Sequence, residues 1–363
     1  MKIKNISIGY LTVPLKTPFI TALRTVSTVD DILVRIETDD GLIGLGEAPP
    51  TAVITGDTKA SIISAIKDFI APVILGRDLS DFEGTMNALQ NSMVHNSSAK
   101  AAVDMALYDI FAKSCNLPLY KLLGGFRKQL ENDITISINP VEKMVRDSID
   151  AVADGFNILK IKVGTEGLND IDKISAIRDA IGSEVIIRVD ANQGWEPKQA
   201  VGIIHKIEDL DLRIELVEQP VKAEDVDGLV YVTNSVTTPI MADESVCSPK
   251  DALNILNNRA ADIINIKLMK SGGIFNALKI CSIAESYGVK CMVGCMLEGK
   301  ISASAAAHFA AAKSNVTMVD LDAPVLCAYD PFDSGPSFIG SKITMSENYG
   351  IGIVQTDTEW HYL

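Results

Sequence analysis

From about residue 133 onward, short β-branched apolar runs alternate with longer stretches in which apolar residues recur with helical spacing. Runs of this length are typical of buried parallel strands, and the amphipathic stretches between them are typical of helices packed on a sheet. Eight such runs occur, at residues 134–138, 158–163, 185–190, 214–220, 239–245, 263–268, 291–297 and 316–322. The pattern therefore predicts eight parallel strands connected by helices.

The polar residue at the carboxyl end of these runs recurs at a regular interval. From Lys162 to Asp320, successive residues of this kind lie 24 to 28 positions apart, which matches one strand–helix unit. Eight units predict a (β/α)₇β TIM-like barrel, because the helical pattern after the eighth run is missing or replaced. A doubly wound open sheet is the alternative, but no G-x-G-x-x-G follows any run, and charged residues end many strands.

The first part of the chain has a different pattern of apolar and polar residues. Residues 1–125 open with two strand-like runs and close with helical spacing, which indicates a small α+β unit. The last residues, 325–363, have turn-like and short strand patterns and are expected to return to that unit. We therefore predict an α+β capping domain at 1–125, the barrel at 126–324, and a C-terminal segment that completes the capping domain.

Charge narrows the range of partners. The chain has 33 basic and 47 acidic residues, a net charge of −14, and this field repels phosphate backbones and anionic headgroups. No stretch approaches the roughly 18 uninterrupted apolar residues of a bilayer span. We expect neither nucleic acid nor a membrane as partner, and we expect a homo-oligomer. Six cysteines without a C-x-x-C pair, and the lack of a secretory signal pattern, favour the cytoplasm.

Three acids lie at successive predicted strand ends. Asp190, Glu218 and Asp243 occur in VDAN, VEQP and ADES, so a barrel brings them to one mouth. Each acid alone has an alternative role as the N-cap of the next helix. Three carboxylates at one point repel each other unless a cation lies among them, and oxygen-only ligands favour Mg²⁺ or Mn²⁺.

Three lysines are expected to lie around the same mouth of the barrel. Lys160 and Lys162 point to one face of the second barrel strand, and Lys267 ends a strand four units further round. A solvated strand edge is the usual setting of Lys-x-Lys, but these strands are otherwise apolar and a closed barrel has no edge. A neighbouring cation is expected to lower a lysine pKa toward neutrality, which makes it a usable base. Two such lysines on opposite walls can remove a proton from one face of a carbon and return it to the other.

These motifs together resemble a known family. The lysine pair, the three acids and the lysine on the sixth strand resemble the muconate-lactonizing subgroup of the enolase superfamily, over nearly the whole chain. DLDAP at 320–324 resembles the Asp-x-Asp signature of dipeptide epimerases. FITALRT at 19–25 and ITGDT at 54–58 are similar to the two lid loops of the L-Ala-D/L-Glu epimerases.

The resemblance implies Mg²⁺-dependent epimerisation of a small dipeptide at its C-terminal residue, L-Ala-L-Glu to L-Ala-D-Glu or the reverse. It implies a two-base 1,1-proton transfer by Lys162 and Lys267 through a metal-stabilised enediolate, which Lys160 also stabilises. It further implies that Asp320 and Asp322 hold the α-ammonium and that Arg24 binds the glutamate side chain.

The substrate-binding residues have physical support of their own. Asp320 and Asp322 are expected on one face of the eighth strand, where two acids away from the metal ligands suit an ammonium. A helix cap plus a solvated acid is their alternative role. Arg24 lies in a polar loop and can offer a guanidinium fork or be an ordinary surface arginine. Thr135 can donate its hydroxyl or simply fill the mouth, and Cys295 is expected to offer backbone contacts.

Two other functions within the superfamily, o-succinylbenzoate synthase and N-acylamino acid racemase, are alternatives, although neither needs acids to bind an ammonium. A non-catalytic amino-acid or peptide-binding barrel is the alternative from another class. The histidine-base branches of the superfamily are disfavoured, because every histidine falls in a helical or terminal stretch: His95, His205, His308 and His361. We interpret Gly272 and Gly273 as the entry to a helix rather than a phosphate loop.

Overall fold

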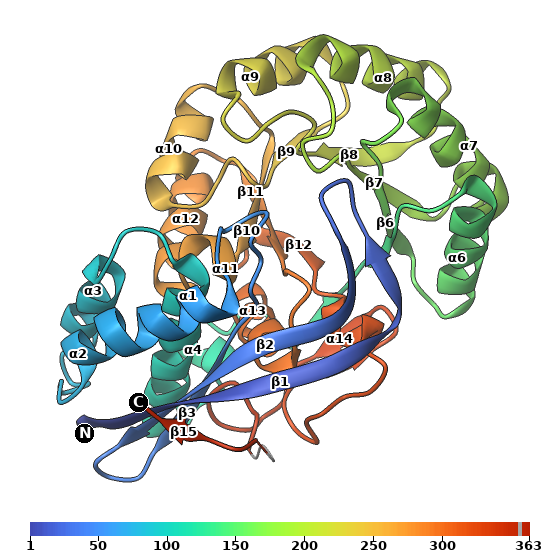
Figure 1. The fold of residues 1–363 in the computed structure, drawn as a ribbon. Coiled ribbons are helices and arrows are strands. Elements are labelled where there is room, and N and C mark those ends of the chain that lie inside the picture. The colour runs from blue at the N-terminus through green and yellow to red at the C-terminus, as the bar shows by residue number, and fades with distance from the viewer. Residues whose placement is uncertain (355–357) are drawn as a thin grey trace.

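Eight parallel strands form the centre of the molecule (Figure 1), in a computed structural model that describes residues 1–354 and 358–363. Their order in the sheet is β12, β11, β10, β9, β8, β7, β6, β5, so sequential strands are neighbours throughout. The strands are β5 Ile134–Ile136, β6 Ile158–Lys162, β7 Ile186–Asp190, β8 Ile214–Glu218, β9 Ile240–Ala242, β10 Ile263–Lys267, β11 Lys290–Gly294 and β12 Val316–Asp320. The prediction of eight parallel strands is confirmed.

Helices connect these strands and lie around the outside of the sheet (Figure 1). They are α6 Val141–Ala153, α7 Asp170–Ile181, α8 Pro197–Asp209, α9 Val226–Ser235, α10 Pro249–Asn257, α11 Leu268–Ser271, α12 Ile274–Ser286 and α13 Lys300–Ala312. The four-residue helix α14, Ala323–Leu326, follows β12 where a full eighth helix would stand. The (β/α)₇β architecture is therefore confirmed, including the replaced last helix.

Side chains join β12 to β5, the two ends of the strand order. The N–H of Leu321 donates to Oδ1 of Asn132 at 2.7 Å, and the N–H of Thr135 donates to Oδ2 of Asp322 at 2.8 Å. These two hydrogen bonds span 189 and 187 residues of sequence. They complete the ring at the seam of the barrel.

Alternation along each strand decides which side chains face the barrel interior. In β6, Leu159 and Ile161 are fully buried in the main apolar core, whereas Lys160 and Lys162 point the other way. Deeper in the barrel, the residues two positions before Glu218 and Asp243 form a small second apolar cluster with a neighbour on β11: Leu216, Met241 and Met292. The residue two positions before Asp190 is instead Arg188, which is buried and paired with Asp133 at 2.8 Å.

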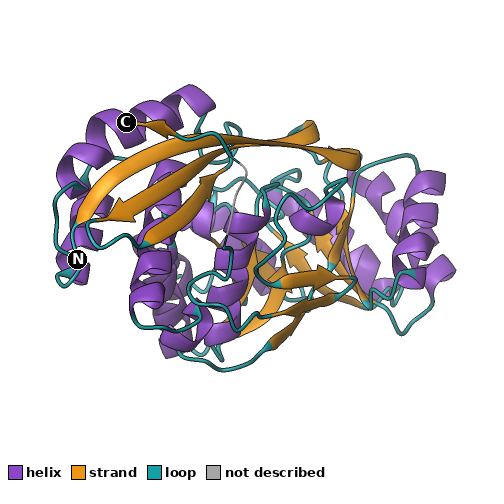
Figure 2. Ribbon diagram, turned by 90° about the horizontal axis from the view of Figure 1, so that it is seen from below, coloured by secondary structure: helices purple, strands orange, loops and turns teal. Residues whose placement is uncertain are grey.

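The N-terminal part forms an antiparallel sheet of β1 Ile3–Ile20, β2 Thr25–Thr38 and β3 Ile43–Ala48. Strand β1 runs past Pro14, and its register with β2 shifts between Pro14 and Phe19. Figure 2 shows these long strands crossing over the barrel. Helical segments pack beside them: α1 Lys59–Ser64, the π-helix Ala65–Ile70, α2 Ala71–Ile74, α3 Phe82–Asn91, α4 Ser97–Ser114 and α5 Leu119–Leu122.

The C-terminal segment contacts both parts of the molecule. Strands β13 Ser337–Ile339 and β14 Lys342–Thr344 form a small sheet with β4 Gln129–Glu131, and β15 His361–Tyr362 pairs with β1. In consequence the two chain ends lie close together beside β1 (Figure 1). Among residues 1–354 and 358–363, no helix is long and apolar enough to cross a bilayer.

Candidate active site

A cavity opens at the carboxyl end of the barrel strands, beneath the β1–β2 hairpin. It encloses about 550 Å³, its open mouth included. Seven of the predicted site residues line it: Arg24, Thr135, Lys162, Lys267, Cys295, Asp320 and Asp322. The other four, Lys160, Asp190, Glu218 and Asp243, are buried around the same strand ends. Residues up to about 300 positions apart in the sequence thus lie together in one site.

Asp190 and Glu218 end β7 and β8, and Asp243 follows β9 directly, because parallel strands all finish at the same face. All three are at most 1% exposed. None of them caps a helix: α8, α9 and α10 begin after other residues, namely Glu196, Asp225 and Ser248. The role as a simple helix cap is therefore wrong for this set.

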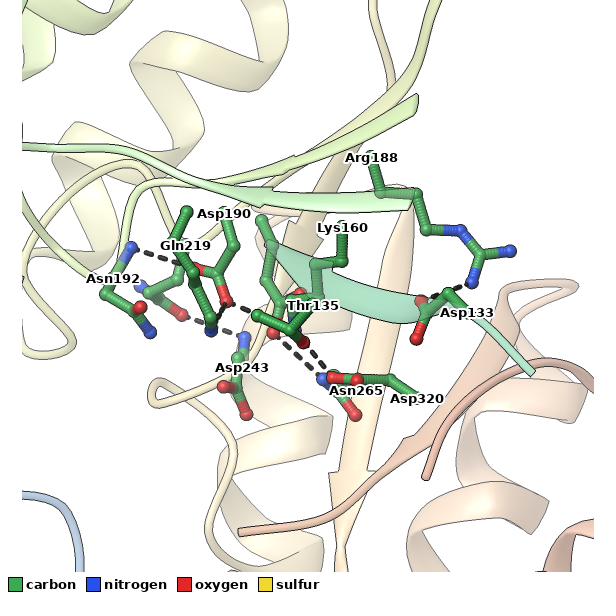
Figure 3. Close-up of polar contacts among 12 residues, drawn as sticks. Asp133, Thr135, Lys160, Arg188, Asp190, Asn192, Gln219, Asp243, Asn265 and Asp320 are labelled. Carbon is green, nitrogen blue, oxygen red and sulfur yellow. Dashed lines mark hydrogen bonds and ion pairs between the residues drawn. The ribbon is translucent and has the colours of Figure 1, made fainter. Parts of the chain in front are cut away.

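Lysine ammonium groups neutralise these acids. Nζ of Lys160 lies 3.1 Å from Asp190 Oδ2 and 2.7 Å from Glu218 Oε2. Nζ of Lys162 donates to the same Asp190 oxygen at 2.6 Å, and Nζ of Lys267 donates to Asp243 Oδ2 at 2.7 Å. Figure 3 shows Lys160, Asp190 and Asp243 converging with their polar neighbours.

The lysine pKa values depend on these neighbours. Burial alone lowers the pKa of Lys160, but the carboxylates of Asp320, Glu218 and Asp190 raise it well above its ordinary value. Lys267 follows the same pattern, since burial is outweighed chiefly by Asp243, and its pKa is raised. The expected lowering toward neutrality requires a cation beside the lysine and stays a prediction, because the group that Lys267 contacts within the chain is the acid Asp243.

The acids fit a divalent cation by donor chemistry. In the described part of the chain, no three Asp, Glu, His or Cys side chains lie in an arrangement that could hold a metal ion as it stands. The acids pair with lysines instead. However, Oε2 of Glu218 and Oδ1 of Asp243 are buried, and each has a lysine ammonium within 2.7 Å but no contact with hydrogen-bond geometry. Burial and then Asp190 raise the pKa of Glu218 to about 7. Crowded carboxylate oxygens of this kind suit a hard ion such as Mg²⁺.

The two acids near the eighth strand have different surroundings. Asp320 ends β12, and its Oδ2 accepts from Lys160 Nζ at 2.7 Å, so it lies directly beside the lysine side of the mouth. Asp322 lies beyond the strand and just before α14, but its side chain does not cap that helix. Burial and then Asp320 raise the pKa of Asp322 to about 6. The expected strand alternation is thus wrong for Asp322, although both acids line the cavity.

Thr135 and Cys295 contribute backbone groups as well as side chains. Thr135 lies on β5 and its N–H donates to Asp322. The N–H of Cys295 donates to the carbonyl of Asp320 at 3.0 Å, and burial raises the pKa of the thiol well above its ordinary value. A neutral thiol agrees with the expectation of no thiol chemistry, but this N–H is already used within the protein.

Arg24 lies in the turn between β1 and β2, at the tip of the first lid loop. The turn is closed by a hydrogen bond from Thr21 N–H to the Arg24 carbonyl at 3.0 Å. Burial lowers the pKa of Arg24, and Asp31 opposes that change. The hairpin is tied to the barrel, because the N–H of Ile138 donates to the Ile20 carbonyl at 3.0 Å. The second lid loop contributes Ile54 to the cavity wall.

Sequence reasoning missed several polar residues of the site. Asn192 lines the cavity, and its Nδ2 donates to Oε1 of Glu244 at 3.3 Å. Asn265 donates to Oε1 of Glu218 at 2.9 Å; it lies two positions before Lys267, so the alternation used for Lys160 and Lys162 would have found it. Lys270 contacts Asp243 Oδ1 at 2.6 Å from helix α11, and no strand pattern signals it.

Comparisons with known proteins agree with this geometry. Residues 5–124 match the mandelate racemase / muconate lactonizing enzyme N-terminal domain, and residues 143–359 match the enolase C-terminal domain-like family. The chain belongs to this branch of the enolase superfamily.

Particular relatives are closer still. The L-Ala-D/L-Glu epimerase of Clostridium acetobutylicum is 55% identical over 97% of this chain and 99% of its own. A substrate-liganded L-Ala-D/L-Glu epimerase from Bacillus subtilis has a TM-score of 0.97 at 51% identity, over 98% of this chain and 99% of that one. A dipeptide epimerase from Enterococcus faecalis, complexed with Mg and L-Leu-L-Tyr, has a TM-score of 0.94 at 43% identity, over 98% and 100%.

Proposed function

We propose that the protein is a Mg²⁺-dependent dipeptide epimerase that interconverts L-Ala-L-Glu and L-Ala-D-Glu at the glutamate α-carbon. One observation carries the proposal: Lys162 and Lys267 line the same cavity from β6 and β10, which stand four strands apart in a ring of eight. A substrate between them has one ammonium or amine group on each face. The names and bound dipeptides of the relatives support the same activity.

Asp190, Glu218 and Asp243 are the proposed ligands of one Mg²⁺ ion, with Mn²⁺ as a substitute of similar ligand preference. When bound there, Mg²⁺ supplies positive charge beside the substrate carboxylate and so makes the neighbouring α-proton more acidic. The lysines now paired with these acids then have fewer anionic contacts. This change favours the neutral form of a lysine that must act as a base.

The proton transfer uses two lysines in opposite states. One of Lys162 and Lys267 is neutral and takes the α-proton, and the other is protonated and returns a proton to the opposite face. The reverse reaction exchanges their roles. Lys160 stays an ammonium, because Asp320, which is not among the proposed metal ligands, lies 2.7 Å from its Nζ and counters the effect of burial on its pKa. The role of Lys160 is therefore electrostatic.

Recognition of the two ends of the dipeptide is divided between the barrel and the lid. Asp322, with Asp320 beside it, binds the α-ammonium, and Thr135 and Cys295 form the adjoining wall. Arg24 binds the glutamate side-chain carboxylate from the lid hairpin. A half-buried guanidinium pairs more strongly with a carboxylate than an exposed one does, because water screens the pair less.

A single experiment tests the function against its alternatives. The protein is incubated with Mg²⁺ in D₂O with L-Ala-L-Glu, and deuterium uptake and diastereomer ratio are measured. Deuterated L-Ala-D-Glu is expected. Uptake confined to N-acylated amino acids would favour the N-acylamino acid racemase, and dehydration of a succinyl substrate would favour o-succinylbenzoate synthase. Binding without any exchange would indicate a non-catalytic protein.

Three further features remain part of the proposal. The chain is divided into a capping domain at 1–125, a barrel at 126–324 and a returning segment at 325–363. The protein is cytoplasmic, in keeping with six free cysteines in the described residues. It is a homo-oligomer, which sedimentation would test directly.

A further inference from the structure

Two barrel helices begin at a glycine and have no side chain of their own to cap them. The N-cap of α12 is Gly273, and the N-cap of α13 is Gly299. By contrast, α9 and α10 are capped by Asp225 and Ser248, each from within its own helix. A helix N-terminus leaves several N–H groups that need an acceptor, and burial makes an unmet N–H costly.

Carboxylates from the N-terminal part supply the missing acceptors. Asp104 of α4 accepts from the N–H groups of Ile274, at 2.6 Å, and Phe275, at 3.2 Å. Glu47 of β3 accepts from the N–H of Gly299 at 3.1 Å through Oε1 and from Ser302 at 2.9 Å through Oε2. Both acids are completely buried. Helix α4 lies against α12, and β3 lies against α13.

The two glycines leave free the space that these carboxylates occupy. A Cβ atom at Gly273 would lie 2.1 Å from Cγ of Asp104, and one at Gly299 would lie 2.2 Å from Oε1 of Glu47. Any side chain able to cap its own helix would therefore collide with the incoming carboxylate. The two helices are built to be capped from the other part of the molecule.

Both capped helices begin a few residues after segments of the chain that line the substrate cavity. Lys267 ends β10, and α12 begins seven residues later. Met296 and Leu297 line the cavity just before α13, and Oε2 of Glu298 accepts from the N–H of Met296 at 3.2 Å. The oxygen Oε1 of Glu298 accepts from the hydroxyl of Ser302 at 2.7 Å, which joins this wall to the first turn of α13.

We propose that Glu47 and Asp104 are positioning residues: by capping α13 and α12 from the N-terminal part, they hold the Met296–Leu297 wall and the Lys267 wall in register with the lid. The part of this inference that concerns turnover rests on the proposed epimerase function. The structural part does not, since the hydrogen bonds exist without substrate.

Asp31 makes the Glu47 contact dependent on a proton. Gly299 N–H also donates to Oδ2 of Asp31 at 3.2 Å, so the carboxyl groups of Asp31 and Glu47 meet at one N–H. Two carboxylates this close repel each other unless one of them is protonated. Burial and the neighbouring Glu47 raise the pKa of Asp31 well above its ordinary value, which favours a proton on Asp31.

The charged and titratable groups around this pair come from every adjoining element. Burial raises the pKa of Glu47 to about 7 and that of Glu298 to about 8. The others are Arg24 in the lid turn, Lys267 on β10, Cys295 after β11, and Lys16, Cys327 and Asp330 on the far side. A rise in pH through 7 to 8 adds negative charge to this buried set and so increases the repulsion between its carboxyl groups.

Hydrogen–deuterium exchange of the substrate-free protein tests the structural part. Glu47→Gln keeps the side-chain size but can accept only one of the two N–H bonds, and Asp225→Asn is the control, a self-capped barrel helix. We expect faster exchange at residues 296–303 in Glu47→Gln, and at 268–276 in Asp104→Asn. In Asp225→Asn, exchange at these two segments should equal wild type. Wild-type exchange at 296–303 in Glu47→Gln would overturn the proposal.

Kinetics with L-Ala-L-Glu and Mg²⁺ tests the functional part. Glu47→Gln should raise KM about tenfold with little change in kcat, whereas Asp104→Asn should lower kcat about tenfold, both within the range for losing a helix cap. Equal losses of thermal stability in all three variants with unchanged kinetics would mean a merely structural role. If wild type turns over no dipeptide, the epimerase function fails, and the exchange data still decide the positioning role.

Asp31→Asn tests whether the proton on Asp31, rather than the position of its side chain, affects the Glu47 contact. An asparagine amide is neutral as the protonated acid is, but it cannot ionise. This variant should keep the wild-type KM at pH 6, and its KM should change less with pH than that of wild type, because one titrating carboxyl group is removed. A KM that changes with pH as in wild type would overturn the proton-dependent part.

Discussion

The backbone N–H of Thr135 donates to Oδ2 of Asp322 across the seam at which the barrel closes, at a distance of 2.8 Å. One carboxylate thus joins the first and last strands and also lines the substrate cavity. Oδ2 already accepts from the barrel, which leaves Oδ1 for the proposed ligand. If Asp322 binds the substrate as proposed, recognition and barrel closure are coupled through this residue.

We expect Asp322→Asn to impair every free dipeptide and to spare N-acetylated ones, because the proposed partner of Asp322 is the α-ammonium. The loss should be about 2 to 5 kcal/mol in kcat/KM, the range for truncating one member of a buried charge pair. The asparagine oxygen can still accept from Thr135, so the barrel seam survives. Equal losses for L-Ala-L-Glu and its N-acetyl derivative would contradict the assignment.

The same residue predicts a pH dependence. Burial and Asp320 raise the pKa of Asp322 to about 6, and only the ionised form attracts an ammonium. Below pH 6 the carboxyl is protonated, so KM for free dipeptides should fall as pH rises from 5 to 7. The KM of the N-acetylated dipeptide, measured in parallel, should lack this step.

Spacing was enough to predict the barrel, since the polar strand ends recur every 24 to 28 residues. It also predicted which acids and lysines meet, because parallel strands share one carboxyl end. The position of Asp322 was predicted less well, because a strand pattern does not reveal that β12 stops at Asp320. Cross-domain contacts such as Glu47 with Gly299, 252 residues apart, leave no local signal at all.

The metal hypothesis predicts that Asp190→Asn, Glu218→Gln and Asp243→Asn each abolish turnover and weaken Mg²⁺ binding, because each removes one negative charge from the ion's ligand set. Calorimetric titration with Mg²⁺ measures the binding without reference to activity. Asp81→Asn, which alters only the cap of α3, is the matched control and should bind Mg²⁺ as wild type does. Full activity after EDTA treatment would refute the hypothesis.

The two-base mechanism predicts that Lys162→Ala and Lys267→Ala both eliminate epimerisation, because each removes the group on one face of the α-carbon. Each variant should still exchange the α-proton of one isomer with D₂O, and the two variants should act on opposite isomers. Mass spectrometry of recovered L-Ala-L-Glu and L-Ala-D-Glu distinguishes these cases. Interconversion at the wild-type rate by either variant would show that the assignment is wrong.

The buried acids of the Glu47 cluster predict how stability varies with pH. The folded-state pKa values of Asp31, Glu47 and Glu298 lie above their unfolded values, so the folded protein binds more protons. Their contribution is fully present below about pH 4 and is lost as pH rises through 7 and 8. The urea midpoint should therefore fall from pH 6 to 9.

Asp31→Asn is the control for that trend. It removes one titrating group, so the slope of unfolding free energy against pH should decrease by the equivalent of about one proton. Asp225→Asn should keep the wild-type slope. An unchanged slope in Asp31→Asn would mean that Asp31 does not carry the proton.

The last prediction concerns Arg24, the residue on which the proposed selectivity for glutamate depends. If its guanidinium pairs with the side-chain carboxylate under the lid, Arg24→Ala should lose about 2 to 5 kcal/mol in kcat/KM toward L-Ala-L-Glu. L-Ala-L-Leu, which has no such carboxylate, should lose far less. Arg24→Lys keeps the charge but not the fork and should fall between them. Comparable losses for both dipeptides in Arg24→Ala would instead show that the arginine positions the lid.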